Sequence, residues 1–296
     1  MEIGKYEVFL KTVESGSLTK TAEIMGYTQP GISMMIKKLE EECGFALFHR
    51  MKNGVEPTGE GKRMIPIIRE LVNWQNQFEQ TAAMINGLQI GTIKIASYSS
   101  MSYHWLPKII SNFRRDYPKI EIEVIEGGVS EIEKWLAEKS IDLAFLTKRN
   151  GQKFSFIPLK EDRVLAVLPP SSASCAGKPF KLEDFKNEDF IVSASYYDND
   201  CYSIVEEYQR RYGEMPNKKL SATDPYTVIS MVENGLGISV LPELLLKRHS
   251  QNIVAVPVDP PFTRTIILAA PSFDTCSPAA AKFMSYIKDF CKNEAD

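Results

Sequence analysis

Hydrophobic positions in the first 57 residues recur at helical spacing in short blocks separated by turn signals. In the first block four residues share one helical face: Tyr6, Phe9, Leu10 and Val13. A second helix is expected at residues 18–25, between Ser17 and Gly26, and a third begins after Thr28. Serine and threonine are good residues to cap a helix start, and the tight turn at 26–27 makes these two helices a helix-turn-helix.

Residues 45–58 alternate like two short strands around the turn at 52–54 and predict a hairpin, or wing. A helix of about 30 residues then runs from Thr58 to about Gly87. It carries one apolar stripe: Met64, Ile67, Ile68, Leu71, Trp74, Phe78, Ala82 and Ile85. A helix of this length with an apolar stripe is expected to pair with the same helix of a second copy. The alternative is packing on its own C-terminal domain.

From about residue 91 strands alternate with helices. Expected strands are 92–97, 120–126, 141–146, 164–168, 190–193 and 265–270; expected helices are 101–117, 130–139, 204–212, 225–233 and 279–290. Such alternation predicts an α/β fold built on parallel strands. The second set, from about residue 164, indicates a second lobe, and the last strand and helix would return to the first.

Composition narrows the class of protein. Hydrophobic residues make up 44% and charged residues 25% of the 296, which is ordinary for a globular chain and excludes a mostly disordered or collagen-like one. No apolar run approaches the length of a membrane span, and the acidic N-terminal stretch does not resemble a secretory signal. Five scattered cysteines without a CxxC motif indicate reduced thiols and a cytoplasmic location.

The sequence gives little support for a metal site, for catalysis or for general binding of polyanions. The three histidines lie far apart, so we expect no zinc site. There is no P-loop, no GxGxxG and no Ser/His/Asp arrangement, so we expect neither an enzyme nor a cofactor. The net charge of −3 argues against a general polyanion binder, and any contact with nucleic acid must be local.

Several runs resemble the winged helix-turn-helix of LysR-type transcriptional regulators. They are SLTKTAE at 17–23, TQPGIS at 28–33, KKLEEE at 37–42 and LFHR at 47–50, and TGEG at 58–61 is similar to the start of that family's linker helix. In the second half the markers are DLA at 142–144 and GLGISVLP at 235–242. The resemblance implies an α/β chain with an N-terminal winged helix-turn-helix and a C-terminal two-lobed effector domain that resembles periplasmic binding proteins.

The implied domains are a DNA-binding domain at 1–58, a linker helix for dimerisation at 59–88 and an effector-binding domain at 89–296. Lobe I would hold about 89–162 and 266–296, and lobe II about 163–265.

The third helix would enter the major groove with its first turn at the base edges. The proposed DNA contacts are Ser17, Thr19, Lys20, Gln29, Pro30, Ser33, Met34, Lys37, Arg50 and Lys52. The Gln29 amide suits adenine, and Pro30 could contact a thymine methyl. Met34 stands where most relatives would place an arginine, which removes a phosphate or guanine contact.

Some of these residues, and two of their neighbours, have a structural alternative. Ser17 and Thr28 would serve only as helix caps, and Lys37 and Lys38 would pair with Glu41 and Glu42. Residues 1–66 also hold nine Lys and Arg against nine Asp and Glu, so the domain is not basic overall. Binding must therefore depend on where the charges lie and on several copies per DNA.

Ligands of open α/β sheets bind at the carboxyl ends of strands, near helix N-termini. The effector contacts expected on this ground are Ser99, Ser100, Met101, Gly128, Thr147, Ser193, Tyr196, Asp224 and Tyr226. Hydroxyl and N–H groups there would hold a carboxylate or similar anion. The alternatives are helix capping for Ser100 and Asp224 and packing for the tyrosines. Arg264 would either reach the anion or lie on the surface at the start of a strand.

The resemblance thus implies a sequence-specific regulator that responds to a small-molecule effector. Its partners would be an inverted repeat in promoter DNA, further copies of itself as a homodimer or homotetramer, and RNA polymerase, with no membrane. Two alternatives stay open. Cys201 could make the protein redox-responsive, although no resolving cysteine lies nearby. A two-lobed solute-binding protein is the other, although residues 1–87 would then have no role.

Overall fold

The computed structural model describes residues 4–52, 54–86, 90–193, 202–247 and 252–293. The chain forms two compact units: residues 1–91 with 138–140, and residues 92–137 with 141–296. Among the helices that the structure describes, none is long and apolar enough to span a membrane.

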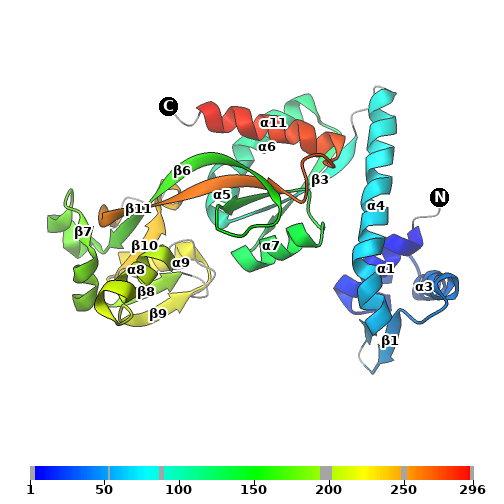
Figure 1. Cartoon of the computed structure of the whole chain (residues 1–296), viewed down its shortest axis with the longest axis horizontal. Helices are drawn as coiled ribbons and strands as arrows, with labels where there is room; N and C mark the ends of the chain where they lie inside the picture. Colours follow the sequence, from blue (N-terminus) through cyan, green and yellow to red (C-terminus); the bar gives the residue numbers. More distant parts are fainter. Residues whose placement is uncertain (1–3, 53, 87–89, 194–201, 248–251, 294–296) are drawn as a thin grey trace. The chain divides into compact units, whose positions relative to one another are not determined.

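The first unit is helical with a small hairpin (Figure 1). Its elements are α1 Gly4–Ser15, α2 Leu18–Met25, α3 Gln29–Cys43, β1 Phe48–Met51, β2 Gly54–Pro57 and α4 Gly59–Ile85. The helices and the hairpin expected from the sequence are therefore present. Gly26 ends α2 with a φ of 70°, a left-handed conformation that glycine adopts without strain.

Apolar residues from α1, α2, α3, the hairpin and α4 share one core: Val8, Phe9, Ala22, Ile32, Ile36, Leu39, Leu47, Phe48, Val55 and Ile68. The hairpin is fixed to α3 through Glu40, whose carboxylate accepts hydrogen bonds from the N–H groups of Leu47 (2.7 Å) and Phe48 (3.2 Å). The rings of Phe9 and Phe48 lie 5.3 Å apart. Hairpin and helix-turn-helix therefore form one packed body.

The start of α4 is locked against the segment before the hairpin. The Thr58 hydroxyl accepts a hydrogen bond from the Gly61 N–H (2.8 Å) and donates one to the Ala46 carbonyl (2.8 Å). At Gly61 a β-carbon would lie 2.2 Å from the Leu47 carbonyl oxygen, so only glycine fits.

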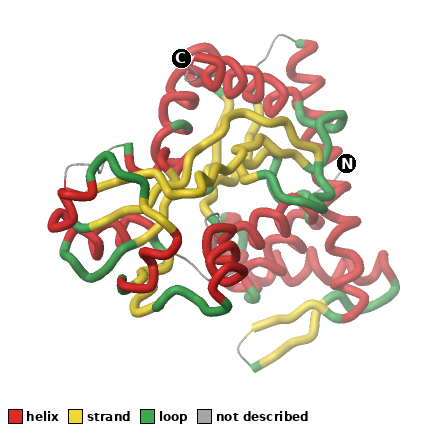
Figure 2. The backbone as a smooth tube through the Cα atoms, turned by 60° about the vertical axis from the view of Figure 1, so that its left-hand side comes forward, coloured by secondary structure: helices red, strands yellow, loops and turns green. Residues whose placement is uncertain are grey.

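The second unit is built on a seven-stranded sheet in the order β10-β6-β11-β5-β3-β4, with β7 added beside β11 and a separate β8–β9 pair. Its strands are drawn in yellow in Figure 2. The strands are β3 Gly91–Ser97, β4 Ile120–Glu126, β5 Leu143–Thr147, β6 Ser155–Leu168, β7 Phe180–Lys181, β8 Phe190–Ser193, β9 Lys218–Ala222, β10 Ser239–Pro242 and β11 Val254–Ala270. The helices are α5 Ser99–His104, α6 Leu106–Asp116, α7 Val129–Ala137, α8 Tyr202–Tyr212, α9 Pro225–Glu233, α10 Glu243–Leu246 and α11 Pro278–Asn293, with 3-10 turns at Pro170–Cys175 and Leu182–Asn187.

The expectation of parallel strands holds only in part. β3 and β5 are parallel, as are β8 and β9, but β11 runs antiparallel to both β5 and β6. The strands expected at 164–168 and 265–270 are the apolar ends of two much longer strands that lie side by side along the unit (Figure 1). Because four charged residues at 160–163 interrupt the apolar pattern, the sequence did not predict the part of β6 that precedes residue 164.

The single helix expected at 101–117 is also wrong. The chain forms α5 and α6 with a break at Trp105, and Pro107 lies in the first turn of α6. A proline ring is favoured in the first turn of a helix and costs stability in its interior, so Pro107 favours a new helix start.

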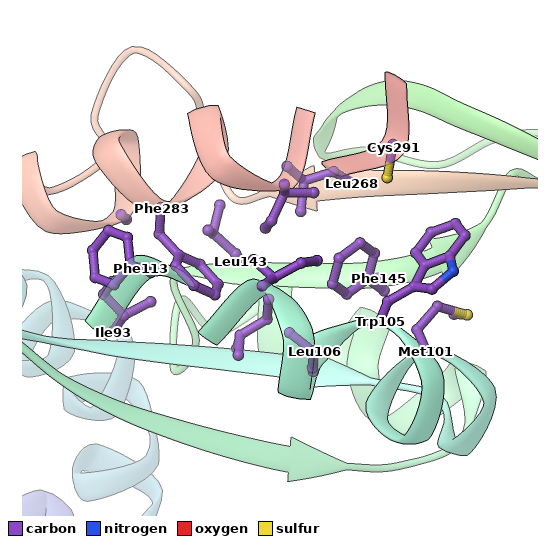
Figure 3. Close-up of a cluster of buried hydrophobic side chains, with 14 of the residues drawn as sticks. Ile93, Met101, Trp105, Leu106, Phe113, Leu143, Phe145, Leu268, Phe283 and Cys291 are labelled. Carbon is purple, nitrogen blue, oxygen red and sulfur yellow. The ribbon is translucent and has the colours of Figure 1, made fainter. Parts of the chain in front are cut away.

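Lobe I packs α5, α6 and α11 on one face of β3, β5 and β11. Figure 3 shows the aromatic part of this core, with Phe113 and Phe283 at one end and Met101 and Trp105 at the other. Lobe II has two further cores, one with Phe185 and Tyr208 at its centre and one under α9 with Val228 and Val232.

Candidate DNA-reading face and effector site

The third helix of the first unit has one buried and one exposed face. Ile32, Ile36 and Leu39 are buried at helical spacing and fix its rotation. On the opposite side Pro30, Met34 and Lys37 are exposed. Ser33 is half-buried, and Gln29 is exposed at the first position of the helix. Thr19 and Lys20 on α2, and Arg50 and Lys52 in the hairpin, are exposed as well.

Two of the hydroxyls act as helix caps. The Ser17 hydroxyl accepts a hydrogen bond from the Lys20 N–H (3.3 Å), and the Thr28 hydroxyl accepts one from the Gly31 N–H (3.2 Å). These bonds orient the starts of α2 and α3. The Ser17 hydroxyl therefore serves as a helix cap in the protein without DNA.

Charge on α3 is confined to its second half. Lys37 pairs with Glu41 at 3.6 Å, and both side chains are largely exposed. Glu42 pairs with Lys5 of α1. An exposed pair of this kind contributes little stability, so Lys37 can exchange Glu41 for a phosphate at small cost.

In the second unit a buried ion pair joins the two long strands. Asp162 of β6 lies directly opposite Arg264 of β11, and the two residues are only 6% and 4% exposed. The Arg264 Nε donates to Asp162 Oδ2 at 2.9 Å, and its Nη2 donates to the Ser100 hydroxyl of α5 at 3.0 Å. Arg264 is thus a buried cation, not a surface residue at a strand start.

The second Asp162 oxygen accepts a hydrogen bond from the Leu244 N–H at the start of α10 (3.0 Å). Burial raises the pKa of Asp162, and the Arg264 guanidinium and the Leu244 N–H oppose that rise. The pair therefore ties β6, β11, α5 and α10 together at one point.

Thr147, the last residue of β5, is buried near the Asp162–Arg264 pair in the sheet. It lies opposite Ile266 in the ladder, so its side chain is on the same face as those of Ile266 and, two residues earlier, Arg264. Within the described part of the chain its hydroxyl has no hydrogen-bond partner. A buried hydroxyl left unpaired costs free energy, and a bound ligand could satisfy it.

Met101 and Gly128 have local structural roles. The Met101 side chain is fully buried in the lobe I core, and its N–H donates to the Tyr98 carbonyl (3.1 Å). The Gly128 N–H donates to the Glu131 carboxylate (3.0 Å) at the start of α7. Ser99 is half-buried at the start of α5.

From lobe II, Asp224 caps α9: its carboxylate accepts from the N–H groups of Tyr226 (3.3 Å) and Thr227 (3.0 Å). The Tyr226 ring lies 5.2 Å from the ring of Tyr103 on α5, which brings the start of α9 against lobe I. Ser193 is buried at the end of β8. Tyr196 and Cys201 lie outside the described residues.

Sequence reasoning missed Asp162 and Tyr103. Asp162 lies on the same face of β6 as Val164, Ala166 and Leu168, which are buried in the lobe II core. A charged residue on the apolar face of a strand could have indicated a buried ion pair. Tyr103 gave no signal, because only packing brings it to Tyr226. In the described ranges no group of three or more His, Cys, Asp or Glu side chains is placed to hold a metal ion.

Comparison with known proteins identifies both parts of the chain. Residues 3–62 match the model for the bacterial regulatory helix-turn-helix protein, lysR family, and residues 86–292 match the LysR substrate binding domain. The chain is 32% identical over 292 residues to the HTH-type transcriptional regulator YvbU of Bacillus subtilis (strain 168), covering 98% of each protein.

Solved structures share the fold. A full-length OxyR variant from Pseudomonas aeruginosa has a TM-score of 0.75 at 19% identity and matches 99% of this chain and 95% of its own. CbnR in complex with its target DNA has a TM-score of 0.66 at 16% identity, with 98% and 100% coverage. The chain belongs to the LysR family of DNA-binding transcriptional regulators, with an N-terminal helix-turn-helix domain and a C-terminal effector-binding domain.

Proposed function

We propose that the exposed face of α3 binds the major groove of promoter DNA and that Gln29 contacts a base edge there. The observation that carries this proposal is the division of α3 into a buried apolar face and an exposed face, together with the exposure of Gln29 at the first position of the helix. A glutamine amide can make a paired hydrogen bond to adenine. Thr19, Lys20, Arg50 and Lys52 would contact phosphates on either side.

The working assembly is a dimer through α4, built further into a tetramer. Along α4 the side chains of Ile67, Leu71, Trp74 and Phe78 are exposed at helical spacing in the single chain, and a second copy would cover them. A dimer presents two helix-turn-helix units, which suits an inverted repeat. With residues 1–58 on DNA and 59–88 as the linker, the part from 89 onward would respond to the effector and alter access of RNA polymerase in the cytoplasm.

The effector is a small anion held where α5 meets the ends of the strands. Its contacts would be the Thr147 hydroxyl, Ser99, Ser193 and Tyr226, with Arg264 behind them. The guanidinium is already paired with Asp162 and Ser100, so a carboxylate must share or displace the Asp162 carboxylate. The support is the buried unpaired hydroxyl beside a buried cation.

The DNA contact is tested by substituting Gln29→Ala and Lys20→Ala in the full chain and measuring affinity for the upstream DNA of its gene and for unrelated DNA. Gln29→Ala should lower specific binding by about tenfold or more and non-specific binding little. Lys20→Ala should lower both and reduce the salt dependence of binding by about one ion. Equal losses on both DNAs for Gln29→Ala would overturn its proposed contact with a base.

The effector site is tested by thermal-shift screening against small carboxylates, amino acids and inorganic oxyanions. A ligand at about 100 times its Kd adds roughly 2.7 kcal/mol, which is readily seen. Thr147→Val should raise the melting temperature of the free protein slightly, because it removes an unpaired buried hydroxyl, and should weaken the response to the ligand. Thr92→Val is the matched control, because Thr92 is exposed and lies at the start of the neighbouring strand β3, away from the site. An unchanged ligand response in Thr147→Val would place the site elsewhere.

A further inference from the structure

The exposed part of α3 has an unusual chemistry for a surface that meets DNA. Residues 29–36 contain no charged side chain, and the first charged residue of the helix is Lys37, which is paired with Glu41. Guanine is recognised most often by arginine or lysine, which donate to its O6 and N7 atoms. The first two turns of α3 have neither.

In place of a cation, this surface has an exposed apolar pair. The Met34 side chain is 70% exposed, and Pro30 lies one turn before it on the same side of the helix. Neither residue belongs to the core of the unit, which uses Ile32, Ile36 and Leu39 from this helix. In the major groove the one apolar group that a base presents is the thymine methyl.

We infer that Met34, with Pro30, binds thymine methyl groups, so that the first two turns of α3 select A·T base pairs. Gln29 complements this choice, since its amide suits the adenine edge, and Ser33 accepts either base. This inference rests on the proposed placement of α3 in the major groove. It adds the chemical class of base pair that α3 recognises and the residue that recognises it.

The test replaces thymine by deoxyuridine, which differs from it only by the missing methyl. Binding sites are first selected from a random-sequence duplex library with the full-length protein. Each thymine of the selected site is then replaced in turn, and affinities are measured at one salt concentration. Replacement of one particular thymine in each half-site should lower the affinity of the wild-type protein by about three- to fivefold, as expected for the loss of one buried methyl contact.

Variants assign that loss to a residue. Met34→Ala should lose most of the difference between the thymine and uracil sites, and Met34→Leu should keep a larger part of it. Met51→Ala is the matched control, because Met51 is also an exposed methionine but lies in the hairpin strand β1. It should keep the full difference. Since Met34 is exposed, its variants should melt at the wild-type temperature.

The possible failures are distinct. A wild-type protein that selects a site but is indifferent to uracil at every thymine would overturn the inference and leave specific DNA binding intact. Retention of the full uracil effect by Met34→Ala would exclude Met34 as the contact. Failure to select any preferred sequence would contradict the placement of α3 in the groove itself, and the inference with it.

Discussion

Asp162 and Arg264 are two opposite charges buried together at the point where lobe I meets the long strands. Removing two charges from water costs several kcal/mol each, and only a well-formed pair with its other hydrogen bonds satisfied offsets that cost. Here the guanidinium reaches both Asp162 and Ser100, and the carboxylate also accepts the Leu244 N–H. The pair therefore fixes one arrangement of four elements.

We predict that Asp162→Ala destabilises the second unit by about 3 to 5 kcal/mol, because it leaves the Arg264 cation buried without its counter-ion. The double variant Asp162→Leu with Arg264→Met should recover most of that loss. Calorimetric unfolding of the full chain measures both. A loss below about 1 kcal/mol for the single variant would show that Arg264 reaches water in the folded protein.

Thiol reactivity should differ strongly between cysteines. Burial raises the pKa of Cys276 to about 11, and the nearby Asp142 adds to the rise. At pH 8 its thiolate fraction is then about a hundredfold below that of a thiol with a pKa of 9.0, and the thiolate is the reactive form. Alkylation of Cys276 should be slow in the native chain, fast in urea, and faster as the pH rises toward 11.

The reference thiol in that experiment is Cys175, which is exposed. Mass spectrometry of the time course follows each cysteine separately. Native labelling of Cys276 at the rate of Cys175 would contradict the partial burial and raised pKa of Cys276.

At the scale of elements, the start of α4 lies in close backbone contact with the segment just before the hairpin. Thr58 bonds to the Ala46 carbonyl and to the Gly61 N–H, and the helix backbone at Gly61 touches the Leu47 carbonyl. The start of the linker helix is therefore determined by the winged unit, and its direction follows from that contact.

We predict opposite effects for two neighbouring glycines. Gly61→Ala would place a β-carbon 2.2 Å from the Leu47 carbonyl oxygen, so the backbone must move, and we expect a loss of about 2 kcal/mol or more. Gly59→Ala meets open space and should stabilise α4 by up to about 1 kcal/mol through its better helix propensity. Thermal unfolding compares them, and equal effects would refute the close contact.

At the scale of the whole molecule, the exposed apolar stripe of α4 is the surface on which the proposed dimer rests. Trp74 is 56% and Phe78 69% exposed in the single chain, which is far more than large aromatic side chains usually show in a finished assembly. Both lie on one side of α4. In the proposed dimer, two copies of α3 would bind the two half-sites of an inverted repeat.

Phe78→Asp should therefore shift the protein toward the monomer and weaken binding to a two-half-site operator by at least about tenfold, because each half-site would then be bound separately. Asn76→Asp, an exposed position on another side of α4, is the control and should leave both properties unchanged. Light scattering coupled to size exclusion measures the oligomeric state. An unaltered mass for Phe78→Asp would assign the assembly to another surface.

The sequence by itself determined the elements whose causes are local. Ser17, Gly26 and Thr28 set the bounds of α2 and α3 through capping and a left-handed turn, and apolar spacing identified which face of α3 is buried. These features depend on residues within a few positions of one another, so they can be inferred before any fold is known.

The strand pairing and the buried ion pair at the centre of the second unit could be established only from the tertiary structure. Residues 160–163 in the middle of β6 are charged and belong to a strand because β11 supplies their partner. Arg264 becomes a buried cation because Asp162 lies opposite it and the Ser100 hydroxyl accepts a hydrogen bond from it. Thr147 and Tyr226 acquire their surroundings in the same way. Pairing across about 100 residues leaves no local period in the sequence, since burial there is decided by the partner strand and not by the neighbours along the chain.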